Sequence, residues 1–192
     1  MSTTQPIKNT AQLKLFKNYY LQVNPNPRNY VLIVFGLNSA LRISDILGLT
    51  YGDIYDFERE LWKSHVAVTE QKTGKSNLIY MNSQIQQSLK KYAAPDGEKN
   101  SSWLFCSQMQ KSQPLSRFQA YRIIKNAAAY AGLDSNISCH SLRKTFGYHA
   151  WKQGTPPALL MSIFNHSSYQ ITKRYLCIDQ DDKDAVFSKI EL

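Results

Sequence analysis

The chain reads Cys-His-Ser-Leu-Arg at residues 139–143, and the interpretation of the whole sequence starts from this short stretch. His140 and Arg143 are three residues apart, so on a helix both side chains lie on one face. His166 follows later, and Tyr175 comes nine residues after it. Singly these residues mean little, because a histidine near a helix start is more often a cap or a core residue, and the chain has 12 tyrosines. Their order and spacing together indicate one site.

The first half of the chain offers two more cations. Arg42 lies in Ala-Leu-Arg-Ile-Ser-Asp at residues 40–45, and Lys72 lies in Gln-Lys-Thr-Gly-Lys at residues 71–75. Alone, Arg42 with Asp45 is typical of a surface ion pair, and a lysine in a Lys-Thr-Gly-Lys turn is usually just exposed. Added to the later residues, they complete the groups needed to bind a phosphodiester and attack it.

Strand transfer at a phosphodiester needs a nucleophile, a base, an acid and positive charge on the non-bridging oxygens. The planar, permanently charged guanidinium of arginine suits the last task. Tyr175 would be the nucleophile, and His140 would accept its proton. His166 would donate a hydrogen bond to the phosphate, and Lys72 at a hairpin tip would protonate the leaving 5′-oxygen. A phenol has a pKa near 10, and we expect the surrounding cations to lower it.

Bulk properties agree with an anionic partner. The 192 residues suit one domain, and the formal net charge of +9 favours nucleic acid first and an anionic membrane second. The three cysteines show neither disulfide nor zinc spacing, so we expect no metal and no cofactor. A secretory signal and a membrane-spanning run are both missing from the sequence, which predicts a cytoplasmic protein.

The apolar periodicity predicts an α+β domain, mainly α, with one small antiparallel sheet. The expected hairpin pairs residues 65–69 with 77–81. The expected helices cover residues 10–23, 28–38, 41–47, 83–93, 116–131, 140–153, 157–164 and 168–176. No acidic residue occurs from position 99 to 133, so a basic face there would suit DNA phosphates, although for any single residue a solvated helix face is the commoner explanation. The candidate DNA-binding residues are Lys75, Lys111, Arg117, Arg122 and Lys125.

The candidate site resembles the signature of the tyrosine recombinases, the lambda-integrase family. That family carries an arginine, a hairpin lysine, His-x-x-Arg, a second histidine or tryptophan, and a tyrosine nine residues later. The matching residues here are Arg42, Lys72, His140, Arg143, His166 and Tyr175. Asp45 stands where the family often has glutamate, and Phe-Asn-His replaces the common Leu-Gly-His. Lys72 is preferred to Lys75 because the family's active lysine usually precedes the glycine of the turn.

The resemblance implies the family's catalytic fold over residues 10–178. It also implies cleavage of double-stranded DNA through a 3′-phosphotyrosyl link, without metal or ATP, within a tetramer at the bacterial nucleoid. Residues 1–9 are expected to be a loose leader. The family's usual DNA-grasping domain does not precede the first arginine in this sequence, so we expect either an excised catalytic domain or, as the favoured interpretation, a single-domain recombinase of a mobile element or prophage. Residues 179–192 form a tail that docks either on its own protomer or on a neighbour. Two alternatives remain at this point: a type IB topoisomerase, and a non-catalytic DNA-binding protein on the same scaffold.

Overall fold

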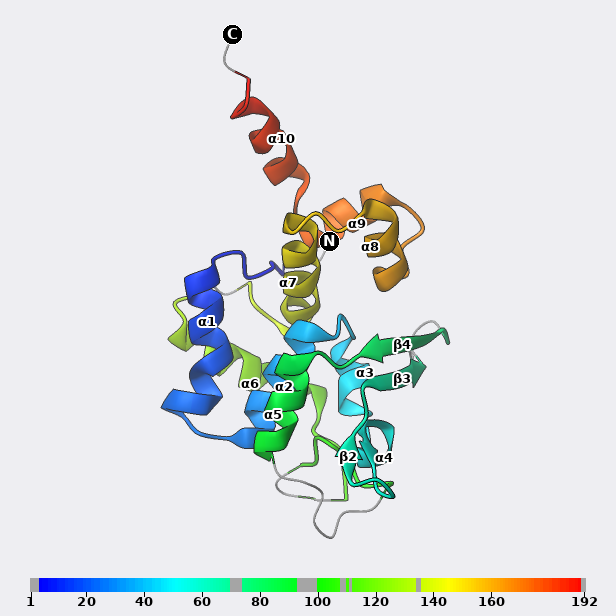
Figure 1. The fold of residues 1–192 in the computed structure, drawn as a ribbon. Helices are drawn as coiled ribbons and strands as arrows, with labels where there is room; N and C mark the ends of the chain where they lie inside the picture. Colours follow the sequence, from blue (N-terminus) through cyan, green and yellow to red (C-terminus); the bar gives the residue numbers. More distant parts are fainter. Residues whose placement is uncertain are drawn as a thin grey trace.

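The structure is a computed structural model that describes residues 4–69, 74–92, 100–107, 110, 112–133 and 136–190 (Figure 1). The helices in order are α1 (Thr10–Asn18), the π-helix η1 (Tyr19–Val23), α2 (Pro27–Asn38), α3 (Ile43–Leu47), α4 (Tyr51–Ile54), α5 (Ser83–Tyr92), α6 (Arg117–Tyr130), α7 (Cys139–Lys152), α8 (Pro157–Phe164), α9 (Tyr169–Leu176) and α10 (Asp179–Phe187). The strands are β1 (Tyr55–Asp56), β2 (Leu61–Trp62), β3 (His65–Thr69) and β4 (Ser76–Tyr80). The predicted α+β, mainly α fold is confirmed.

Helix α7 joins two hydrophobic clusters. Its Leu142 belongs to the larger cluster, built around the almost wholly buried α2, which packs against α5 and α7. Its Tyr148 belongs to a smaller cluster with residues of α8 and α9. Figure 1 shows α2, α5 and α6 at one end of α7, and α8 and α9 at the other. The region between these clusters is therefore where groups from both halves of the sequence can meet.

Gly147 sets how closely α8 and α9 approach α7. A Cβ atom at this position would lie 2.5 Å from Leu176 Cδ2 and 2.6 Å from Phe164 Cζ. Both distances are shorter than any van der Waals contact, so the missing side chain is what lets Phe164 and Leu176 pack on the helix. The position of α9, which carries Tyr175, follows from this contact.

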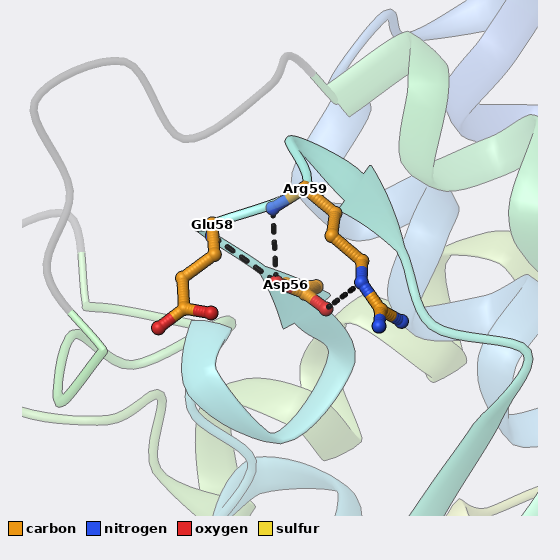
Figure 2. Close-up of polar contacts among 3 residues, drawn as sticks. All are labelled: Asp56, Glu58 and Arg59. Atoms are coloured by element: carbon orange, nitrogen blue, oxygen red, sulfur yellow. Dashed lines mark hydrogen bonds and ion pairs between the residues drawn. The ribbon is translucent and has the colours of Figure 1, made fainter.

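The predicted hairpin is present, and a second, shorter one was not predicted. Strands β3 and β4 pair antiparallel in the register His65↔Tyr80 to Thr69↔Ser76. The second hairpin pairs β1 with β2, each only two residues long, which is too short to leave an alternating pattern in the sequence. Its turn is held by Asp56, whose Oδ1 accepts from the backbone N–H groups of Glu58 and Arg59 at 3.1 Å each, while Arg59 Nε lies 3.9 Å from Asp56 Oδ2 (Figure 2).

The leader expected to be loose is bound to α7 over its described part. Ile7 is buried, and its N–H donates to the Thr145 hydroxyl at 2.9 Å. The Gln5 N–H donates to the Asn136 carbonyl at 3.1 Å. The sequence predicts a loose segment because these partners are more than a hundred residues away and leave no local pattern.

The C-terminal tail forms a helix that the sequence analysis did not anticipate. Figure 1 shows α10 projecting away from the rest of the fold. Val186, Phe187 and Ile190 at its end are exposed, with 76% of Phe187 accessible. None of the helices in the described part of the chain has the length and apolar character of a membrane-spanning segment.

Candidate active site

Arg143 lies at the centre of the candidate site. Its guanidinium is buried, with 4% exposed, and it projects from the second turn of α7. Nη1 donates to the Ala40 carbonyl, and Nη2 donates to the Phe164 carbonyl at 3.2 Å. The guanidinium carbon also lies 4.9 Å from the centroid of the Phe164 ring. One planar cation therefore holds together the end of the α2 segment and the end of α8.

Arg42 enters the same region from the other half of the fold. The chain turns sharply after α2 because Ala40 has a positive φ of 55°, and Arg42 then becomes the N-cap residue of α3. Asp45 is 4% exposed and lies in the first turn of α3, where the helix dipole favours a negative charge. Arg42 is half-buried and close enough to oppose protonation of both His140 and His166.

Asn165 explains how His166 is presented. It ends α8 in the left-handed conformation, with φ 54° and ψ 42°. Asparagine tolerates this conformation better than most residues, which accounts for asparagine where the resembled family commonly has glycine. The chain then turns so that the His166 ring stacks on Phe164, with 5.6 Å between centroids.

Thr172 contacts His166, although it is not among the site residues predicted from the sequence. The Thr172 hydroxyl is 3.1 Å from His166 Nδ1 and 3.4 Å from the Ser168 carbonyl. The hydroxyl has one proton to donate. When it donates to the Ser168 carbonyl, it accepts from Nδ1–H, and when it donates to Nδ1, the proton of a neutral ring sits on Nε2, which can then donate to a phosphate oxygen. A buried threonine six residues after a histidine carries no recognisable spacing signal, so only the fold identifies it.

Tyr175 lies on α9, half-buried among groups from α7 and α8. Its ring is 5.1 Å from His166 and 5.5 Å from Phe164, centroid to centroid. Burial raises the pKa of the Tyr175 phenol above its ordinary value, while Arg143 and Arg42 oppose this rise. The expectation of a lowered pKa is therefore wrong for the free protein, because desolvation of the phenolate outweighs the two cations.

His140 lies at the rim of the site, in the first turn of α7, and its ring is exposed. Partial burial, then the charges of Arg117, Lys144, Arg143 and Arg42, lower the pKa of His140. The pKa of His166 is also lowered, by burial and by Arg143 and Arg42. Both imidazoles are consequently neutral at physiological pH and able to accept a proton.

The structure brings together Arg42, His140, Arg143, His166 and Tyr175, which come from α3, α7, the α8–α9 turn and α9. Lys72 and Lys111 lie outside the described residues. Lys75 is exposed beside β4, and Arg117 and Arg122 are exposed on α6, where Lys125 is half-buried. Phe164 was not singled out from the sequence, although its ring contacts Arg143, His166 and Tyr175.

Comparison with known proteins agrees with this arrangement. Residues 11–181 match the profile of the phage integrase family. The chain belongs to the phage integrase family. It is 42% identical over 187 residues to the probable integrase/recombinase YoeC of Bacillus subtilis, covering 97% of both chains. Its enzyme class is that of the tyrosine-type recombinases.

Two solved structures show how the chain compares in three dimensions. The XerA recombinase superimposes with a TM-score of 0.75 at 17% identity, over 98% of this chain and 65% of that one. The Tn1549 transposon integrase, solved in complex with circular intermediate DNA, gives a TM-score of 0.65 at 25% identity, over 87% of this chain and 61% of that one. The chain thus spans less than two thirds of the length of these two recombinase chains.

The two histidines allow a test of the site's electrostatics by NMR titration. We expect the ring signals of His140 and His166 to titrate below the ordinary value of about 6.5. Arg117→Gln should raise the midpoint of His140 and leave that of His166 unchanged, because Arg117 lowers the pKa of His140, whereas the pKa of His166 is lowered by burial, Arg143 and Arg42. A midpoint at or above about 6.5 for either ring, or equal shifts of both in Arg117→Gln, would contradict this description.

The lowered pKa values of His140 and His166 determine how the free energy of unfolding changes with pH. The folded protein binds protons on these rings less readily than the unfolded chain does. The free energy of unfolding should therefore be unaffected by them above about pH 6.5 and decrease as the pH falls below that value.

Proposed function

We propose that the chain is a site-specific DNA recombinase that cleaves and rejoins double-stranded DNA through a 3′-phosphotyrosyl intermediate. The observation that carries the proposal is the convergence of two guanidiniums, two neutral imidazoles and one phenol from four separate segments. The proteins that resemble it include an integrase solved in complex with DNA. Acting on DNA, the enzyme would be located at the bacterial nucleoid. We propose that it recombines the DNA of a mobile element or prophage.

The proposed first step conserves atoms and charge. The Tyr175 oxygen forms a bond to the scissile phosphorus as the bond from phosphorus to the 5′-oxygen breaks. The phenol proton passes to neutral His140, and Lys72, which lies outside the described residues, protonates the leaving 5′-oxygen. Arg42 and Arg143 neutralise the non-bridging oxygens, a task that water-excluded cations perform well.

The raised pKa of Tyr175 gives His140 its role. A phenol that stays protonated at neutral pH is a poor nucleophile, so its proton must leave as the bond to phosphorus forms. The second strand's 5′-hydroxyl then attacks the phosphotyrosyl link and restores the diester. Because the link retains the energy of the original bond, ATP is not required, and the arginines supply the positive charge that a metal would otherwise provide.

Covalent trapping tests the nucleophile. On a nicked DNA substrate that loses the 5′-hydroxyl fragment, the wild-type protein should form an adduct that survives denaturation, and Tyr175→Phe should form none. Tyr169→Phe is the matched control, since Tyr169 is another tyrosine on the same helix, at its first residue. An adduct with Tyr175→Phe would overturn the assignment.

The same reaction separates the proposal from its two alternatives. Absence of any adduct with the wild-type protein would favour a non-catalytic DNA-binding protein. Relaxation of a supercoiled plasmid that lacks any special site would favour a type IB topoisomerase. Strand exchange between two copies of one defined sequence is the result that the recombinase proposal expects.

Helix α6 is the proposed DNA-binding face. It exposes Arg117 and Arg122 together with the aromatic side chains of Phe118 and Tyr121. Each phosphate contact that is lost should reduce the slope of log affinity against log salt by about 1. The double variant Arg117→Gln/Arg122→Gln should therefore bind DNA more weakly with a shallower slope in a gel-shift titration.

Lys14→Gln on α1 serves as the control for this titration, because it removes an exposed charge from a different helix. It should leave the salt slope nearly unchanged. Equal slopes for wild type and the α6 double variant, or a wild-type midpoint that does not move between low and physiological salt, would remove α6 from the DNA interface.

We also propose that the tail, residues 179–192, binds a neighbouring protomer in a tetramer on DNA. The exposed apolar end of α10 carries this proposal, because Val186 and Phe187 are 55% and 76% accessible on an isolated protomer. The variant Val186→Asp/Phe187→Asp should keep adduct formation on a single site but lose the four-protomer complex in light scattering. Lys183→Gln, also on α10, should keep both. Retention of the tetramer by the apolar double variant would show that the tail docks elsewhere.

A further inference from the structure

Lys144 is a buried ammonium beside the candidate nucleophile. It follows Arg143 on α7 and is 2% exposed. Its Nζ donates to the Thr4 carbonyl at 2.6 Å, lies 3.6 Å from Cys177 Sγ, and lies 5.2 Å from the centroid of the Tyr175 ring. One side chain thus connects the N-terminal segment, α7 and the end of the helix that carries Tyr175.

No carboxylate neutralises this charge in the part of the chain that the structure describes. The partners of Lys144 there are a carbonyl, a thiol and the face of an aromatic ring. Burying an ammonium without an opposite charge opposes folding. A negative charge that forms next to it offsets this penalty, and the Tyr175 phenol is the adjacent group on which such a charge develops during attack.

The N-terminal segment holds the lysine in place. The Ile7 N–H donates to Thr145 Oγ1 at 2.9 Å, and the Ile7 carbonyl lies 3.0 Å from His149 Nε2. Lys8 Nζ donates to the Cys177 carbonyl at 3.2 Å, immediately after α9. The segment is therefore fixed to α7 and to the end of α9 at once, and the Thr4 carbonyl has a defined position over Lys144.

We propose that Lys144 is a positioning residue for the nucleophile. Its ammonium, fixed by the Thr4 carbonyl, lies against the Tyr175 ring and stabilises the negative charge that spreads into this ring as the phenol attacks phosphorus. This inference rests on the proposed role of Tyr175. Lys144 transfers no proton, since the phenol proton passes to His140 as the bond from oxygen to phosphorus forms.

Other groups near Tyr175 also affect the pKa of its phenol, and they stay unchanged in the Lys144 variants. Arg143 comes from the same helix as Lys144, and Arg42 precedes α3. His166 faces the ring from the α8–α9 turn, and Cys177 follows on the same segment. Lys144 differs from the two arginines because its ammonium lies over the face of the Tyr175 ring.

The test compares Lys144→Met, which keeps length and loses charge, with Lys144→Arg, which keeps charge. The rate of covalent adduct formation on the nicked substrate is measured against pH. Loss of a cation close to a phenol shifts its titration by about one unit or more. Lys144→Met should therefore move the rate profile up by about one pH unit and slow the reaction roughly tenfold at pH 7, while Lys144→Arg keeps most of the wild-type rate.

Two matched measurements exclude a purely structural role. The melting temperature of Lys144→Met should equal or exceed that of wild type, because a buried unneutralised charge is replaced by an apolar chain. Lys8→Met removes the ammonium of the N-terminal segment, which donates to the Cys177 carbonyl and lies over the Tyr148 ring, and should leave the pH profile in place. Lys144→Gln, which can still donate to Thr4, should shift the profile as Lys144→Met does, and it replaces that variant if the methionine protein folds poorly.

The outcomes are distinct. An unchanged pH profile in both Lys144→Met and Lys144→Gln overturns the inference alone. So does a wild-type profile restored by Lys144→Gln, because the charge would then be irrelevant. A wild-type protein that forms no Tyr175-dependent adduct overturns the proposed function, and this inference with it.

Discussion

The guanidinium of Arg143 is the contact on which the geometry of the site depends. A buried cation needs acceptors, and those of Arg143 include the backbone carbonyls of Ala40 and Phe164. Ala40 follows α2, which packs in the larger cluster, and Phe164 ends α8 in the smaller cluster that Ala40 also joins, so the guanidinium binds both carbonyls only when the α2 and α8 segments have packed against α7. The positive φ of Ala40, unfavourable for a residue with a Cβ, directs one of these carbonyls to the cation. The site therefore exists only in the fully folded protein.

Desolvation decides the charge state of the resting site. It lowers the pKa of His140 and His166 and raises that of Tyr175, so the imidazoles are neutral and the phenol is protonated. The two guanidiniums stay charged while the phenol is neutral. In the proposed reaction, these cations bind a DNA phosphate and then favour the developing phenolate on Tyr175.

The sequence predicted the parts whose signal is local. The helix over residues 140–153 and the hairpin that begins at residue 65 follow from periodicity. The predicted catalytic residues lie close together in the fold, apart from Lys72, which lies outside the described residues. Contacts between distant segments were missed. Lys144 looks like an ordinary solvated lysine in sequence, and only the Thr4 carbonyl, 140 residues away, shows that it is buried. The described part of the leader, residues 4–9, was wrongly predicted to be loose for the same reason.

The end of α9 separates the nucleophile from the tail. Cys177 ends the helix in the left-handed conformation, with φ 60°, and Lys8 binds its carbonyl. Ile178 is fully buried in the smaller cluster, and α10 begins only at the following residue. The anchored residues Cys177 and Ile178 thus lie between Tyr175 and α10, which projects away from the rest of the fold. A neighbouring protomer can therefore bind the exposed end of α10 without displacing Tyr175, so assembly and cleavage can be separated by mutation.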